Sequence, residues 1–154
     1  MPRPLSEVKG IVIHHSVTRD NVLLKDLEEI RAMHLYLGYK DIGYHYIVER
    51  INGKPYLKVG RDKLAVGAHC IPDKYPYYNQ YMNYYWLGLC ILGDFSNKAP
   101  DNEETKIVCN GIREIVRKCG FKLSRKSVIG HRDASYTECP GKYTMAKIYK
   151  ELKI

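Results

Sequence analysis

The sequence predicts an α/β protein in which a central mixed β-sheet is flanked by helices. Strand-like and helix-like segments alternate along the chain, and one pair of strand-like segments is joined by Asn52-Gly53, a strong hairpin signal. The resulting order of elements, βα-ββ-β-α-β-α, is typical of a mixed sheet covered by helices. Because a length of 154 residues suits one domain, we expect a single domain over residues 1–154.

The first two elements are a buried strand and an amphipathic helix. Residues 10–14 are apolar and β-branched after a glycine, which predicts a short buried strand. From 22 to 37 the apolar residues recur at helical spacing. We expect Asn21 to cap this helix and Gly38 to end it, since these residue types favour those positions.

The middle of the chain predicts a hairpin and one further strand. Residues 44–51 and 55–59 are the strand-like segments on either side of the Asn-Gly turn. Residues 70–85 contain two prolines and six tyrosines and are expected to form a long surface loop. The apolar segment 86–92 that follows is expected to be a buried strand.

The last part of the chain predicts two helices separated by a short strand. Asp101 with Glu104 is the pattern of a capping box at a helix start. An apolar stripe follows at helical spacing, formed by Val108, Ile112, Ile115, Val116 and Cys119. Residues 127–130 are expected to be a short strand, and 142–152 a final helix after a Pro-Gly pair.

The charge balance is basic, and the chain has no membrane-spanning pattern. Lys and Arg number 25 against 17 Asp and Glu, for a net charge of +8. Such an excess favours polyanionic surroundings, whether nucleic acid, anionic lipid or an acidic cell wall, but does not choose among them. No apolar run approaches the length of a membrane span, and the N-terminus lacks the apolar stretch of a secretory signal.

The five cysteines do not suggest a disulfide framework, because their number is odd and no CxxC pair occurs. Cys109 and Cys119 are ten positions apart in a helical segment and are expected to pack as small apolar residues. Cys139 differs, because it lies eight positions after His131 in a segment rich in polar residues.

Three residues form a candidate metal site. His14 closes the first strand, His131 follows the strand that ends at Gly130, and Cys139 lies on the loop beyond it. Imidazole nitrogen and thiolate sulfur both suit Zn²⁺, and three protein ligands leave a fourth position open, as in catalytic zinc sites. Two histidines and a cysteine also occur together by chance, so their spacing alone does not decide between a metal site and packed side chains.

The segments around these residues carry a family resemblance. Five of them occur in order: IVIHHS at 11–16, IGYHY at 42–46, VGAH at 66–69, LGLCILGDF at 87–95 and GHRD…TECPG at 130–141. Together they resemble the type 2 N-acetylmuramoyl-L-alanine amidases, which include phage lysozymes and the peptidoglycan recognition proteins. The resemblance spans roughly residues 10 to 150, and its most specific parts are the HRDxxxTxCPG and GYH segments.

The resemblance implies a role for each matching residue. His14, His131 and Cys139 match the family's zinc ligands. Tyr44 matches its active-site tyrosine, and Thr137 matches a position where the phage lysozymes carry a lysine and the active recognition proteins a threonine. The Tyr44 hydroxyl is expected to donate to the developing oxyanion or to orient the attacking water. The Thr137 hydroxyl is expected to bond either the oxyanion or the zinc-bound water.

Four further residues mark the limits of the resemblance. His69 matches a histidine that lines the substrate groove. His15 is expected to be packed or solvent-facing, and His45 to be structural, since neighbours on a strand face opposite sides. The recycling amidases of the superfamily have an aspartate as third ligand and a glutamate on the central strand. Here Cys90 stands at about the position of that glutamate. A recycling role is therefore not expected.

Together with the candidate metal site, the resemblance implies a zinc-dependent amidase that cuts the bond between N-acetylmuramic acid and L-alanine, as a phage endolysin or an autolysin. We expect a monomer that binds bacterial peptidoglycan, without nucleic acid or membrane insertion; if phage-encoded, it stays in the host cytoplasm until its release to the wall. The main alternative is a non-catalytic module that recognises peptidoglycan. A nucleic-acid or polymerase-binding protein is a second alternative, but no basic stripe with interleaved aromatic residues supports it.

Overall fold

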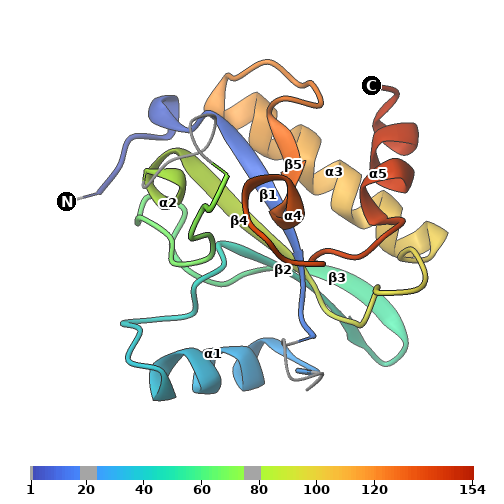
Figure 1. The fold of residues 1–154 in the computed structure, drawn as a ribbon, viewed down its shortest axis with the longest axis horizontal. Helices are drawn as coiled ribbons and strands as arrows, with labels where there is room; N and C mark the ends of the chain where they lie inside the picture. Colours follow the sequence, from blue (N-terminus) through green and yellow to red (C-terminus); the bar gives the residue numbers. More distant parts are fainter. Residues whose placement is uncertain (1, 18–23, 75–80) are drawn as a thin grey trace.

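Five strands form one mixed sheet in the order β3-β2-β4-β1-β5 (Figure 1). The structure, a computed structural model, describes residues 2–17, 24–74 and 81–154. β4 pairs in parallel with both β1 and β2, β5 pairs in parallel with β1, and β2 and β3 form the antiparallel hairpin. The mixed sheet predicted from the sequence is therefore confirmed. The strands are β1 (Gly10–His15), β2 (Tyr46–Ile51), β3 (Lys54–Val59), β4 (Trp86–Ile91) and β5 (Val128–Gly130).

One face of the sheet packs against α3 (Asn102–Cys119) and α5 (Thr144–Leu152), and the main hydrophobic core lies between them. Ile11 and Ile13 of β1 point into this core, which both helices meet with apolar stripes. Burial of such side chains contributes roughly 1.5–3 kcal/mol each. In the described part of the chain, no helix is long and apolar enough to cross a bilayer.

The opposite face carries α1 (Leu27–Tyr36), α2 (Met82–Tyr85) and α4 (His131–Ala134). Val12 points to this side because it alternates with the residues that enter the main core. His14, two positions further, therefore shares its face. Two smaller apolar clusters pack these helices against the sheet, and the side chain of His14 is buried on the same face.

The helices α3 and α1 both begin at an aspartate cap. Asp101 accepts a hydrogen bond from the Glu104 amide at 2.8 Å, and Glu104 accepts one from the Asp101 amide at 3.1 Å, which confirms the capping box. Asp26 caps α1 in a similar way by accepting from Glu29 N–H at 2.8 Å. Each cap satisfies amide groups that have no partner inside the helix.

Several predicted boundaries were wrong. The first helix begins at Leu27 rather than 22, because Asp26 supplies its cap; the predicted cap, Asn21, lies outside the described residues. Gly38 does end it, with a φ of 91° that suits glycine. The segment 70–85, expected as loop throughout, ends in the short helix α2, while 75–80 lie outside the described residues. The final helix begins at Thr144 rather than 142.

Candidate active site

The two candidate histidine ligands meet because their strands are parallel neighbours. Ile13 of β1 pairs with Gly130 of β5, so the next residues, His14 and His131, lie at the same edge of the sheet. Their ring centroids are 4.6 Å apart. This edge holds the carboxyl ends of the parallel strands, where open α/β sheets commonly bind ligands.

The loop after α4 returns Cys139 to the end of β1. Arg132 N–H donates to the Cys139 carbonyl at 2.7 Å, which closes the loop on itself. The sulfur then lies 3.8 Å from Nδ1 of His14. One ligand atom from each of His14, His131 and Cys139 lies within 4.8 Å of the other two, so the structure brings the predicted set together.

The donor set fits a zinc ion. Bonds of about 2.3 Å to sulfur and 2.0–2.1 Å to nitrogen, at a tetrahedral angle, separate the two donors by roughly 3.5 Å. The separation between His14 Nδ1 and Cys139 Sγ is close to this value. Two imidazoles and a thiolate are also the ligand types that zinc accepts, and a site with three protein ligands keeps one position open.

The short helix α4 fixes the direction of His131. Gly130 N–H donates to the Asp133 carboxylate at 2.8 Å, which caps the helix at the residue before His131. Ser135 N–H donates to the His131 carbonyl at 3.0 Å and closes the turn. The pairing of β5 and the cap of α4 together hold the backbone of His131, which restricts where its ring can lie.

Burial sets the protonation of the candidate ligands. The pKa of His14 is well below its usual 6.5, first because the ring is buried and then because His131 and His69 are near. His14 is therefore neutral at pH 7, as a metal ligand must be. Burial raises the pKa of the Cys139 thiol to about 12, although the hydrogen bond from His15 N–H lowers it in part. A bound cation reverses this preference and favours the thiolate.

Tyr44 lies beside the cluster formed by His14, His131 and Cys139, in the segment that leads into β2. Its ring centroid is 4.9 Å from that of His14. Burial, followed by the nearby thiols of Cys90 and Cys139, raises the pKa of Tyr44 well above 10. Cys90 is the register partner of His14 on β4 and so lies on the same face of the sheet. The phenol therefore keeps its proton and can act as a hydrogen-bond donor.

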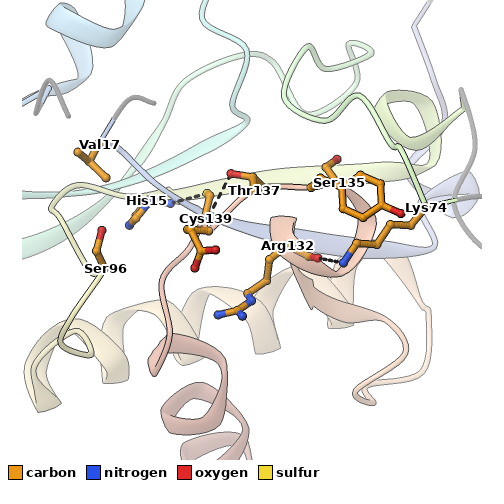
Figure 2. A pocket seen from close by; sticks show the side chains of 10 residues that line it. His15, Val17, Lys74, Ser96, Arg132, Ser135, Thr137 and Cys139 are labelled. Carbon is orange, nitrogen blue, oxygen red and sulfur yellow. Dashed lines mark hydrogen bonds between the residues drawn. The ribbon is translucent and has the colours of Figure 1, made fainter. Parts of the chain in front are cut away.

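A pocket of about 740 Å³ opens next to the cluster, which it meets at Cys139 and Thr137 (Figure 2). The Thr137 hydroxyl accepts a hydrogen bond from Cys139 N–H at 3.2 Å. Lys74 lies at the other end of the pocket, where its Nζ donates to the Arg132 carbonyl at 2.6 Å. The pocket thus runs from the candidate metal site to a basic wall, and the ring of Tyr136 lies 5.4 Å from the Lys74 ammonium.

The other three histidines of interest are buried. His69 contacts His14, with 3.0 Å between His69 Nδ1 and His14 Nε2. The groove role that the resemblance implies for His69 stays a prediction. Of the two alternatives expected for His15, the structure has the packed one, and its Nδ1 accepts from Phe95 N–H at 3.2 Å. His45 is structural, as expected, and bonds to the backbone through both ring nitrogens.

Sequence reasoning gave no role to two residues that support the site. Asp133 is visible in the GHRD segment, and its position three residues after Gly130 is the spacing of a helix cap. Asn83 accepts hydrogen bonds from the amides of His69 and Cys70, both at 2.9 Å. Nothing in the sequence signals this second contact, because it joins segments that only the fold brings together.

Fold and site together define an α/β protein with a two-histidine, one-cysteine cluster at the carboxyl edge of its sheet. The family model described as N-acetylmuramoyl-L-alanine amidase matches residues 4–142. The chain therefore belongs to the N-acetylmuramoyl-L-alanine amidase family, as its motifs indicated.

Individual relatives fall into two groups. The endolysin of Enterobacteria phage T3 is 27% identical over 139 residues, which cover 90% of this chain and 83% of that protein. A peptidoglycan-recognition protein of Drosophila melanogaster is 27% identical over 154 residues, covering 97% of this chain and 78% of that protein. Among solved structures, the N-acetylmuramoyl-L-alanine amidase LysC from Clostridium intestinale URNW has the same fold, with a TM-score of 0.75 at 21% identity over 100% of this chain and 91% of that one.

Proposed function

We propose that the protein is a zinc-dependent N-acetylmuramoyl-L-alanine amidase that acts on bacterial peptidoglycan, as an endolysin or an autolysin. The observation that carries the proposal is the convergence of His14, His131 and Cys139 at one sheet edge, beside a pocket. Family membership and the similarity to a phage endolysin support the same reaction.

The bond to be broken joins the lactyl carbonyl carbon of N-acetylmuramic acid to the nitrogen of L-alanine. Water supplies a hydroxyl to the carbon and a hydrogen to the nitrogen. His14, His131 and Cys139 would hold zinc with one position open. The ion would polarise the carbonyl and lower the pKa of a bound water.

Two hydroxyls are suited to the oxygen that gains negative charge during the reaction. Burial keeps Tyr44 protonated, so its O–H remains a donor. The Thr137 oxygen accepts from Cys139 N–H, which leaves its own hydrogen available to donate. Donors of this kind act by stabilising the transition state more than the substrate.

The pocket suits a polar, extended substrate. Lys74 and Arg132 supply positive charge along its wall, while Tyr136 offers an aromatic face. Stem peptides of peptidoglycan carry carboxylates, which such a wall attracts. The main alternative, recognition without catalysis, has support from the similarity to the Drosophila peptidoglycan-recognition protein. It does not account for the convergence of His14, His131 and Cys139.

Digestion of purified sacculi by three proteins of measured zinc content tests the proposal. His131→Ala should lose both zinc and turnover, because one of three ligands is gone. Tyr44→Phe should keep zinc but lose turnover by about 10²-fold or more, the usual effect of removing one such donor. Tyr36→Phe is a matched control, because Tyr36 is 88% exposed and should retain both properties.

The outcomes separate the two candidate functions. Release of free amino groups from sacculi by the unaltered protein, abolished by chelator and restored by zinc, supports the amidase. Binding to sacculi with no release at any zinc concentration would instead favour the recognition module.

A further inference from the structure

His69 connects a candidate metal ligand to the backbone through both ring nitrogens. Its Nε2 lies 3.0 Å from the Trp86 carbonyl oxygen, and its Nδ1 lies 3.0 Å from Nε2 of His14. His69 is 8% exposed as a residue, and its ring stands almost perpendicular to that of His14, with an interplanar angle of 87°. His69 therefore contacts His14 at Nε2, the ring nitrogen other than the one that lies near Cys139.

These two contacts determine which nitrogen carries each hydrogen. A carbonyl oxygen only accepts, so the Nε2 of His69 must be the N–H that donates to Trp86. In a neutral ring the other nitrogen, Nδ1, is then an acceptor. The hydrogen between the rings consequently belongs to His14 Nε2, which leaves His14 Nδ1 with its lone pair. That nitrogen is the one that lies 3.8 Å from the sulfur of Cys139.

The ring of His69 is held in a tight backbone cradle. A Cβ on Gly88 would lie 2.5 Å from its Cγ, and a Cβ on Gly67 would lie 2.7 Å from its Cδ2. The side chain of Asn83 holds the His69 amide at 2.9 Å. Gly67 and Gly88 thus enclose the ring, and the hydrogen bond to Asn83 holds the His69 backbone, so Nδ1 has little freedom to leave His14.

We propose that His69 is a positioning residue, which sets the tautomer and the orientation of His14 so that Nδ1 faces the metal. The inference rests on the metal site of the proposed function. It gives His69 a different task from the groove contact that the family resemblance implies. Partners of this kind typically change metal affinity by 10- to 100-fold when they are removed.

Two substitutions separate the two hydrogen bonds of His69. In His69→Asn the amide oxygen takes roughly the place of Nδ1 and can still accept from His14. In His69→Gln the amide nitrogen takes roughly the place of Nε2 and can still donate to Trp86, but no acceptor faces His14. Zinc dissociation constants are measured by competition with a chromophoric chelator, with circular dichroism of each metal-free variant as the check on folding.

We expect His69→Gln to bind zinc 10- to 100-fold more weakly than the unaltered protein, and His69→Asn to stay within a few-fold. Equal affinity in the unaltered protein and His69→Gln, or equal losses in the two folded variants, would overturn the proposal.

A second measurement needs no variant. Long-range ¹H–¹⁵N spectra of the metal-free protein report which ring nitrogen of each histidine is protonated. We expect the hydrogen on Nε2 of both His14 and His69; a hydrogen on Nδ1 of His14 would overturn the assignment. This readout is independent of sacculus digestion, so a failure of the amidase proposal and a failure of the tautomer assignment are distinguishable.

Discussion

The backbone N–H of His15 donates a hydrogen bond to the sulfur of Cys139 at 3.3 Å, across 124 positions of sequence (Figure 2). The end of β1 therefore supplies two groups to the site, the ring of His14 and the amide of the next residue. A hydrogen bond to sulfur favours the thiolate over the thiol. The hydrogen bond from His15 N–H helps to hold the Cys139 sulfur beside His14, although Cys139 lies on a loop.

Replacing this sulfur tests its role as a ligand. In Cys139→Ser the hydroxyl is a poor substitute for a thiolate, because it stays protonated at pH 7. We expect zinc affinity to fall at least 100-fold, while the metal-free protein keeps its fold, since the substitution is nearly isosteric. Chelator competition and circular dichroism measure the two properties.

Cys119→Ser is the matched control for this substitution. Cys119 is buried, at 8% exposure, and as the last residue of α3 it packs in the main core, away from His14, His131 and Cys139. Its replacement should leave zinc stoichiometry at one per chain. If both serine variants lost zinc equally, sulfur ligation by Cys139 would no longer explain the result.

Thr137 offers a test of the second hydroxyl at the site. Thr137→Val keeps the shape of the side chain but removes the oxygen, which now accepts from Cys139 N–H at 3.2 Å. We expect turnover of sacculi to fall by about 10²-fold with zinc retained, the order of magnitude for one oxyanion donor. Thr137→Ser should restore most of the activity. Undiminished turnover by the valine variant would exclude a catalytic hydroxyl here.

The sequence was sufficient where local pattern and geometry coincide. The composition of residues 10–14 predicts a strand, and in the structure His14 is the last residue but one of that strand. The Asn52-Gly53 hairpin and the Asp101 capping box were equally predictable, because each depends on neighbours within a few positions.

The sequence was insufficient where two distant segments decide the outcome. Asp26 caps α1, and Glu49 of β2 supports this start by accepting a hydrogen bond from Leu27 N–H at 3.0 Å. Likewise, no spacing along the chain indicates that His69 lies behind His14, 55 positions away. Such contacts depend on tertiary packing, which cannot be predicted from helix and strand propensities or from hydrophobic periodicity.

The last prediction concerns pH and His45, which is fully buried beneath the site. Its Nδ1 accepts from Gly88 N–H at 3.1 Å, and its Nε2 donates to the Ala65 carbonyl at 2.9 Å, so only the neutral ring fits. Burial lowers the pKa of His45 from 6.5 to about 4, although the Ala65 carbonyl opposes this shift.

The sign of the effect follows from proton binding. Between pH 6.5 and about 4 the unfolded chain binds a proton at His45 that the folded protein excludes. The contribution to the free energy of unfolding is therefore complete above pH 6.5 and falls as the pH is lowered toward 4, by roughly 1.4 kcal/mol per unit and about 3 kcal/mol in all. Below the folded pKa the loss stops. Buried His14 and His69, whose pKa values are also lowered, add to the same trend.

His45→Gln isolates the contribution of this one residue, because glutamine does not titrate while its amide can still donate to Ala65. Urea unfolding of both metal-free proteins at pH 7.5, 5.5 and 4 gives the comparison; metal must be absent because its binding also releases protons. The variant should be the less stable protein at pH 7.5, since Gly88 N–H loses its acceptor, and the gap should narrow by about 3 kcal/mol toward pH 4. If the free energies of unfolding of the two proteins differed by the same amount at every pH, His45 would bind its proton equally in the folded and unfolded states. That result would contradict the prediction, which depends on the two backbone hydrogen bonds of the neutral ring.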